Sequence, residues 1–292
     1  MPGGEDFDQI VFDSGSVRVG AFRCDASHPS FHDSGPIRNW CFVFPRTAVE
    51  IQHEHERAFV GNPKVVAFYN KGQVYLRNAI SPEGDQCDWF GVDLEIAQDV
   101  VRTFDPGFES CPERPFRFSR GWSDSQTYLW QRWVFEHVAA GSATEPLAIE
   151  ETVISLLERV VGLAYGGSAP RQPQAPWQVT GDVIHHVEHV LSERWGENLT
   201  LREVGREVGM SPYHLCRMFR RVTGTTLHRY REDLRLRWSL EGVMESSRPL
   251  VDIALDAGFS SHSHFTSSFR RRFAQTPSRV RAHGCQQLRA RF

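Results

Sequence analysis

The sequence of 292 residues lacks several features that define whole classes of protein. No apolar run approaches the ~20 residues that a membrane-spanning helix needs, and the opening Met-Pro-Gly-Gly-Glu-Asp has neither the basic nor the apolar region of a signal peptide. The six cysteines, at positions 24, 41, 87, 111, 216 and 285, show no CxxC spacing, which argues against a disulfide framework or a zinc knot. We therefore expect a cytoplasmic protein that does not enter a membrane.

Lysine is absent from the carboxyl-terminal part of the chain. From Trp177 onward there are 18 Arg, no Lys and 12 Asp and Glu, which gives a net charge of +6, whereas the preceding part has 15 basic and 24 acidic residues and a net charge of -9. A basic half suits a polyanion such as DNA. Arginine in particular favours bidentate contacts to phosphate and guanine.

Catalytic motifs are also missing, because neither a nucleophile motif nor a phosphate-binding loop occurs. His53-Glu54-His55 offers two metal ligands, but no Glu follows at the expected distance and Tyr75 lies where a further histidine is needed. We therefore expect no metal, no cofactor and no catalytic residue, and His53 and His55 in an exposed loop at the end of a strand. Two alternatives remain open: a metal-dependent enzyme domain fused to a DNA-binding module, and a regulator controlled by a protein partner.

Short apolar runs separated by turn residues dominate the chain from about residue 10 to residue 95. Their spacing near ten residues predicts an antiparallel sandwich or barrel, and we favour a cupin-like barrel. The runs are Val17–Ala21, Trp40–Phe44, Val49–Ile51, Val65–Tyr69, Val74–Leu76 and Asp88–Val92.

Three helices are predicted after the barrel, over residues 94–104, 123–140 and 145–164. The last is apolar on more than one side, so one face can cover the barrel while another meets a second subunit; alternatively, the whole helix belongs to the core of its own domain. Residues 166–176 hold three prolines and two glycines, which predicts a linker. We therefore expect a sensing and dimerisation domain over residues 1–165.

A barrel of this size can enclose one small ligand. The acidic balance favours a neutral or cationic effector, although Arg46, Arg57 or Arg77 can pair with a carboxylate. Cys24 and Cys87 are redox-sensor candidates, but ordinary part-buried thiols are the default. The candidate effector-binding residues, which otherwise fill the barrel as core, are Trp40, Phe42, Phe44, Phe68, Tyr75 and Trp89.

The stretch from Leu199 to Arg281 contains one pattern twice. A shift of 49 superposes Val204 and Gly209 on Ile253 and Gly258, and the shift becomes 50 from His214 onward. Each copy predicts a helix, a tight turn at the glycine and a second helix capped by Ser211 or Ser260. A further helix over residues 235–244 lies between the copies and can hold them at a fixed separation.

Two helices with a glycine turn, the second with a basic outer face, are typical of the helix-turn-helix, whose second helix enters the major groove. We expect the early outward positions of these helices to contact bases and their later arginines to contact phosphates. The candidate DNA-binding residues are Pro212, Tyr213, His214, Arg217, Arg220 and Arg221 in the first copy, and Ser261, Ser263, His264, Ser267, Arg270 and Arg271 in the second.

The last hundred residues resemble the AraC/XylS family of bacterial transcription regulators. The resemblance rests on the duplicated motif, on the segments 254–265 and 269–273, and on Gln-Thr-Pro277-Ser-Arg-Val-Arg281; it departs at Ala274, where a glycine is usual. It implies a DNA-binding domain over residues 177–285, an α+β architecture and an amino-terminal sensor. It further implies double-stranded DNA, a small-molecule effector, RNA polymerase and a second copy of the chain as partners, with activation as the expected mode.

Overall fold

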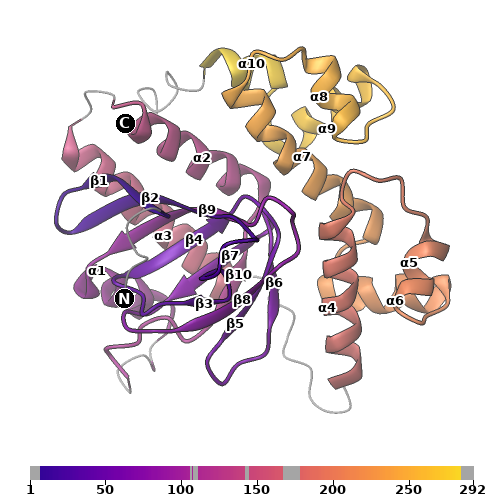
Figure 1. Cartoon of the computed structure of the whole chain (residues 1–292). Helices are drawn as coiled ribbons and strands as arrows, with labels where there is room; N and C mark the ends of the chain where they lie inside the picture. Colours follow the sequence, from indigo (N-terminus) through magenta and orange to yellow (C-terminus); the bar gives the residue numbers. More distant parts are fainter. Residues whose placement is uncertain (1–6, 106, 108–110, 142–144, 167–177, 284–292) are drawn as a thin grey trace. The chain divides into compact units, whose positions relative to one another are not determined.

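A computed structural model describes residues 7–105, 107, 111–141, 145–166 and 178–283. The described residues divide into two compact units, one running to Gly166 and the other from Gln178 to Ala282 (Figure 1). The predicted linker over residues 166–176 lies outside the described residues except for Gly166, which is the last residue of a helix.

The first unit contains two antiparallel sheets, as the alternating apolar runs predict. One has the strand order β1-β2-β9-β4-β7-β10 and the other the order β3-β8-β5-β6 (Figure 1). The antiparallel two-sheet architecture is confirmed, whereas its closer assignment to the cupins stays a prediction. The strands are β1 Asp8–Asp13, β2 Val17–Cys24, β3 Asp33–Ser34, β4 Trp40–Pro45, β5 Val49–His53, β6 Phe59–Gly61, β7 Val65–Tyr69, β8 Tyr75–Ala79, β9 Asp85–Val92 and β10 Arg120–Trp122.

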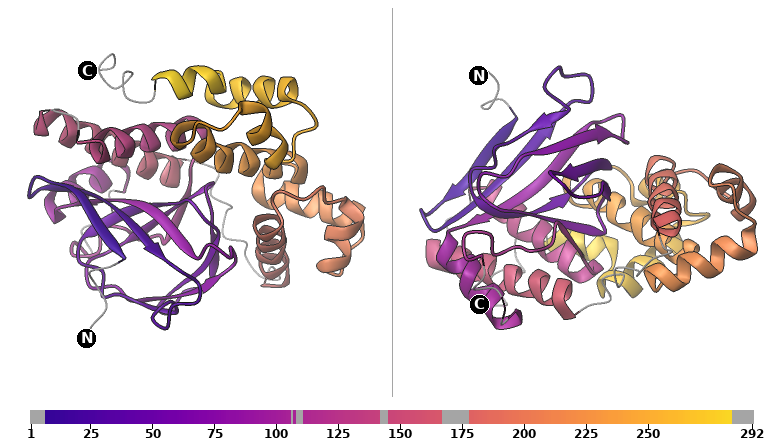
Figure 2. Two further views of the ribbon diagram at one scale, coloured as in Figure 1. Left: turned by 45° about the horizontal axis from the view of Figure 1, so that its top comes forward. Right: turned by 90° about the horizontal axis from the view of Figure 1, so that it is seen from below.

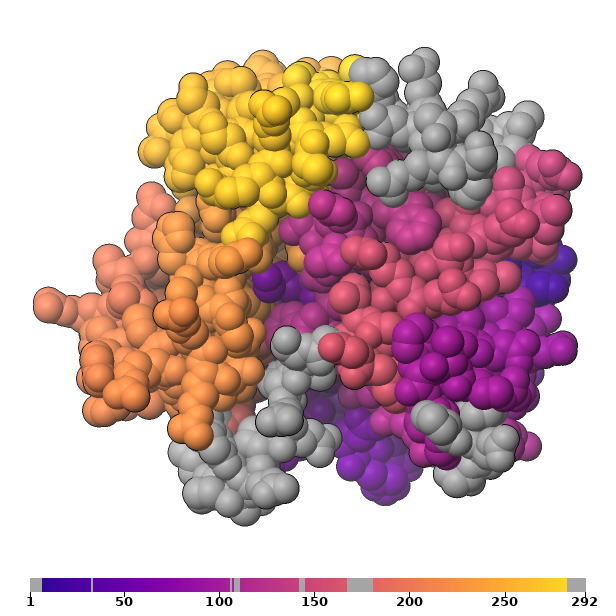
Figure 3. Space-filling model, turned by 180° about the vertical axis from the view of Figure 1, so that it is seen from behind, coloured from indigo at the N-terminus to yellow at the C-terminus, as the bar shows by residue number. Residues whose placement is uncertain are grey.

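Three helices cover the outer face of the six-stranded sheet: α1 (Leu94–Phe104), α2 (Ser125–Ala139) and α3 (Pro146–Gly166) (Figure 2). Their bounds confirm the predicted helices to within two residues at each end. The Phe44 ring on β4 lies 6.4 Å from the Tyr128 ring on α2. The helices form a continuous layer on that side of the unit (Figure 3).

The core between the two sheets differs from the predicted effector pocket. Tyr75 and Trp89 pack there, with Cys41, Val43 and Tyr69 among others. Successive residues of a strand point to opposite faces, so the even-numbered residues of β4 point the other way. Four of the six candidate effector-binding residues are therefore corrected to the helix side of the sheet or its rim: Trp40, Phe42, Phe44 and Phe68.

Direct contacts establish that correction. Phe42 stacks on Phe90 with ring centroids 5.3 Å apart, and Phe44 contacts both of these rings. Phe68 packs against Phe116 and Phe118. Trp40 is half-buried and its indole N–H donates to the carbonyl of Glu113 over 3.0 Å.

Helix α3 packs within its own unit. Its buried side chains occupy two adjacent rows and meet α1, α2 and β10. Leu147, at the start of the helix, is 55% exposed. The apolar breadth that suggested a subunit contact is therefore largely used inside the domain. The buried residues are Ile149, Thr152, Val153, Leu156, Leu157, Val160 and Val161.

The second unit is entirely helical in its described part. Its helix α7 begins eight residues earlier than the predicted helix 235–244, because Thr226 accepts a hydrogen bond from the Arg229 amide and caps a longer rod. The helices are α4 Gln178–Glu193, α5 Leu201–Glu207, α6 Pro212–Thr223, α7 Leu227–Glu245, α8 Leu250–Asp256, α9 His262–Phe273 and α10 Pro277–His283.

Candidate nucleic-acid interface

The sequence duplication corresponds to two helix-turn-helix units of matching length. Helices α5 and α8 each have seven residues and start 49 residues apart, whereas α6 and α9 each have twelve and start 50 residues apart. The additional residue of the second copy therefore lies in its turn. Two residues, Met210 and Ser211, separate Gly209 from α6, but three residues separate Gly258 from α9.

The turns confirm the predicted glycine geometry. Gly209 and Gly258 have φ values of 67° and 74°, in the left-handed region that glycine adopts without steric cost. Gly258 has a second reason to lack a side chain, since a Cβ there would lie 2.6 Å from the Arg235 guanidinium carbon. A capping box that was not predicted from the sequence starts α5: Thr200 accepts from the Glu203 amide, and the Glu203 carboxylate accepts from the Thr200 amide.

The caps of the two recognition helices differ from the prediction in one case. Ser211 caps α6 as expected, accepting a hydrogen bond from the His214 amide. In the second copy the cap is Ser261 instead of Ser260, and it accepts from the His264 amide over 3.1 Å. Ser261 is therefore assigned first to holding the helix end, and its prediction as a base-contacting residue is secondary.

The outer face of α6 carries the predicted candidates together. Tyr213 is 63% exposed, and its hydroxyl accepts a hydrogen bond of 2.9 Å from Arg217 one turn later. The Arg217 guanidinium also lies 5.5 Å from the Tyr213 ring centroid, which is a cation–π geometry. Pro212, His214, Arg220 and Arg221 are exposed as well. Leu215 and Phe219 are fully buried on the opposite side.

The outer face of α9 carries smaller side chains. Ser263, His264, Ser267 and Arg270 are exposed. Arg271 is exposed too, but it lies 3.2 Å from the Glu232 carboxylate on α7 and donates to Ser268. Its predicted phosphate contact therefore competes with an internal ion pair.

Ala274 ends α9 in the same conformation as Gly224 ends α6. Its φ is 59°, compared with 70° for Gly224, so the departure from the family pattern leaves the turn unchanged. A left-handed alanine costs about 1 kcal/mol relative to glycine.

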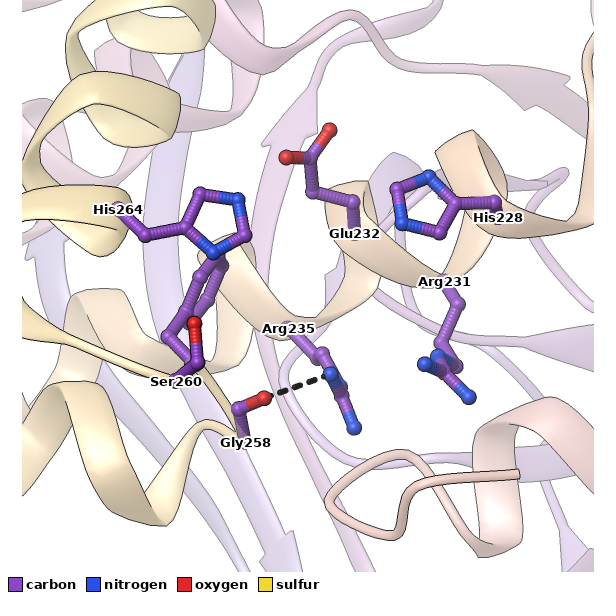
Figure 4. A pocket seen from close by; sticks show the side chains of 8 residues that line it. His228, Arg231, Glu232, Arg235, Gly258, Ser260 and His264 are labelled. Atoms are coloured by element: carbon purple, nitrogen blue, oxygen red, sulfur yellow. Dashed lines mark hydrogen bonds between the residues drawn. The ribbon is translucent and has the colours of Figure 1, made fainter. Parts of the chain in front are cut away.

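Arg235 connects the two copies, a role that was not predicted from the sequence. Its side chain is buried and donates to the carbonyls of Trp195, Gly196 and Glu197, to the Asn198 side chain and to the carbonyl of Gly258. The loop before α5 and the turn before α9 are thus held by one guanidinium (Figure 4).

A second set of contacts fixes α9 on α7. The Ser268 hydroxyl donates to Glu232 over 2.7 Å, and Arg272 lies 2.7 Å from Asp233 and 3.5 Å from Glu232. The helix between the copies is therefore part of the core that both share, and side-chain contacts hold the recognition helices on it.

In the first unit, His53 is buried at the end of β5, which corrects the expectation of an exposed loop. Its ring lies 4.7 Å from the Tyr69 ring and 6.2 Å from the Tyr75 ring. Gln73 donates to Nδ1 over 2.8 Å, which places the ring proton on Nε2, and Nε2 has no hydrogen-bond partner in the described part of the chain. Burial lowers the pKa of His53 to about 4.

Two of the arginines considered as partners for an effector carboxylate already pair with aspartates of the same domain. Arg77 donates to Asp85 over 2.9 Å inside the domain, and Arg46 lies 3.8 Å from Asp88. Burial raises the pKa of the thiols of Cys24 and Cys87, and that of Cys41 to about 12, so their thiolates are disfavoured. Within the described ranges, no three His, Cys, Asp or Glu side chains are grouped to hold a metal ion.

The comparisons with known proteins match this interface. A family model described as "Helix-turn-helix domain" matches residues 204–283. The regulatory protein SoxS of Salmonella typhimurium is 37% identical over 99 residues, which cover 92% of SoxS and 34% of this chain. The HTH-type transcriptional regulator ExsA of Pseudomonas aeruginosa is 28% identical over 138 residues, 47% of this chain. The chain spans 49% of ExsA and 29% of the Escherichia coli right origin-binding protein.

Solved structures give two further similarities. An AraC-type transcriptional regulator from Chromobacterium violaceum is 30% identical with a TM-score of 0.35, covering 37% of this chain and 96% of its own. A variant of ToxT from Vibrio cholerae in its apo form is 10% identical with a TM-score of 0.38, covering 92% of this chain and 98% of its own. Among the described residues, no helix has the length and apolar character required to span a membrane.

Proposed function

Because the chain belongs to the AraC/XylS family of DNA-binding transcriptional regulators, we propose that it recognises its operator through α6 and α9 and responds to a small molecule bound by its first unit. The observation that supports the DNA contact is the pair of equal recognition helices, each capped by a serine and each with an exposed polar outer face. Two such helices on one shared core suit successive major grooves, about 34 Å apart.

The division of roles follows from side-chain geometry. Arg217, held against Tyr213, presents its guanidinium fork near the start of α6, where a base edge lies in a helix-turn-helix complex. Arg220, Arg221 and Arg270 lie farther along their helices and suit phosphates.

Replacement of Arg217 by alanine should therefore relax sequence preference at one or two base pairs. The expected loss of discrimination is ~1–3 kcal/mol, the usual contribution of a bidentate base contact. Selection of binding sites from a random duplex pool, compared with the wild type, measures the change. Arg270→Ala is the matched control, since loss of a phosphate contact weakens all sequences alike. An unchanged site preference in Arg217→Ala would refute the assignment.

The effector proposal rests on the core between the two sheets. The Nε2–H of His53 is a buried donor without an acceptor among the described residues, next to Tyr69 and Tyr75. A carbonyl or hydroxyl oxygen of a ligand would satisfy it. Because Arg77 already pairs with Asp85, a neutral effector fits this core better than a carboxylate does.

We further propose a homodimer that activates transcription through contact with RNA polymerase, with no enzymatic role. Ligand binding changes DNA occupancy only as far as it favours one arrangement of the subunits. The isolated fragment 177–292 should accordingly be a monomer that binds operator DNA without responding to the effector. The aligned region covers 92% of SoxS, so SoxS consists almost entirely of the part that is similar to this fragment.

Thermal-shift screening of neutral metabolites against the full chain supplies the compound for this test, because a ligand of the native state raises the melting temperature. Sedimentation and DNA titrations of the fragment, with and without that compound, then give the result. A fragment that remains dimeric, or whose DNA affinity still changes with the compound, contradicts the proposal.

A further inference from the structure

A pocket of about 190 Å³, lined by charged and polar residues together with Phe259, lies between α7 and the second helix-turn-helix. Such a volume holds roughly six water molecules at ~30 Å³ each, and therefore accommodates a phosphate group. Side chains from α7 and from the start of α9 converge on it (Figure 4). Its lining residues are His228, Arg231, Glu232, Arg235, Gly258, Phe259, Ser260 and His264.

The pocket has an excess of positive charge. Within the part of the chain that the structure describes, Arg235 donates only to neutral oxygens, and Arg231 makes a single hydrogen bond, to the Leu199 carbonyl over 2.8 Å. Neither guanidinium has a carboxylate within 4.0 Å among the described residues. The one carboxylate in the lining, Glu232, is engaged by Ser268, Arg271 and Arg272.

Burial makes this charge costly in the absence of an anion. It lowers the pKa of Arg231, and it lowers that of Arg235 to about 10, with a further contribution from the charge of Arg231. Both shifts oppose the ordinary tendency of arginine to remain fully charged. An anion in the pocket would offset both effects.

Additional donors surround the two arginines. His228 is exposed and has no hydrogen bond or ion pair in the described part of the chain, and the His264 ring packs edge-on against Phe259 at 5.3 Å. The Ser260 hydroxyl also faces the pocket. The two imidazoles and this hydroxyl offer hydrogen-bond donors for oxyanion oxygens.

We propose that this pocket binds one phosphate group of the DNA backbone, beside the major groove that α9 enters. The proposal rests on the proposed function, because His264 belongs both to the outer face of α9 and to the pocket rim. The phosphate would contact Arg231 and His228 of the helix shared by the two copies. It would anchor the DNA between the two recognition helices independently of sequence.

The test uses the full chain and duplexes selected from a random pool, with affinity measured against salt concentration. Arg231→Met should weaken all selected sequences about tenfold, and it should make the slope of log K against log salt shallower by about 0.9, the value for one phosphate. His228→Ala should weaken binding in the same sequence-independent way; it remains informative if Arg231→Met does not fold. Arg229→Met is the control, because this exposed arginine lies on α7 outside the pocket.

The outcomes separate the alternatives. A salt slope that falls in Arg231→Met and stays unchanged in Arg229→Met supports the proposal. Equal losses in the two variants would indicate a general electrostatic effect and overturn it. Inorganic phosphate that stabilises the wild type but not Arg231→Met, with no change in the DNA salt slope, would indicate a free-anion site and also overturn it. Altered sequence preference in Arg217→Ala reports on the proposed function separately.

Discussion

Replacement of Arg235 by methionine is expected to destabilise the DNA-binding unit by about 4 kcal/mol. Methionine matches the length of the aliphatic stem but removes every donor, and so leaves the carbonyls of Trp195, Gly196, Glu197 and Gly258 without this partner. Hydrogen bonds to a charged group contribute ~1.5–3 kcal/mol each and are not additive, and these part-buried acceptors recover only some of that energy from water. For a unit of this size the melting temperature should fall by roughly 15 °C or more.

Two variants give this measurement its controls. Arg235→Lys keeps the charge, but its compact ammonium cannot span acceptors on both copies, so an intermediate loss is expected. Arg229→Met removes an exposed arginine from the same helix and should change stability by at most about 0.5 kcal/mol. Thermal unfolding followed by circular dichroism compares them. If Arg235→Met melts together with Arg229→Met, the guanidinium does not hold the two copies together.

Acid should destabilise the first unit through His53. The pKa of its buried imidazole is about 4, whereas an unfolded histidine titrates near 6.5. Between these values the unfolded chain binds a proton that the folded domain does not. The contribution of the neutral ring is therefore fully present above about pH 6.5 and is lost progressively as the pH falls toward 4, by ~3 kcal/mol in total.

Urea unfolding between pH 4 and pH 8 measures that dependence. His53→Phe, which fits a cluster that includes Phe59 and Tyr69, should flatten the profile over this interval. His55→Gln is the matched control, since the neighbouring His55 side chain is 90% exposed and should leave the profile as it is in the wild type. Parallel profiles for the wild type and His53→Phe would contradict the assignment.

Local patterns predicted most of the secondary structure. The helix predicted over residues 94–104 matches α1 at both ends, because one apolar stripe defines it. Gly209 and Gly258 were identified because a helix that must reverse sharply needs a left-handed residue. Ser260 and Ser261 are adjacent candidates for the same cap, and only the length of the turn decides between them.

The sequence predicted less well which way the core side chains point. Alternation along β4 shows that Phe42 and Phe44 share a face, but not whether that face meets the other sheet or the helices. The buried position of His53 had a local signal, since Val49, Ile51 and His53 alternate along β5 and are all buried. The role of Arg235 had no local signal in the sequence, because its partners lie 23 to 40 residues away in the chain.

The extra residue in the second turn makes the two copies inequivalent. An additional residue between Gly258 and α9 shifts the start of that helix relative to α8, so α6 and α9 do not present corresponding side chains at corresponding places. If the two copies were equivalent, the protein would bind best to a tandem repeat of one short DNA sequence. In this protein the DNA sequences recognised by α6 and α9 should differ. Grafting the outer residues of α6 onto α9 should not transfer the base preference of the first copy. The DNA site of one subunit should therefore have a direction, and reversing that site alone should weaken binding.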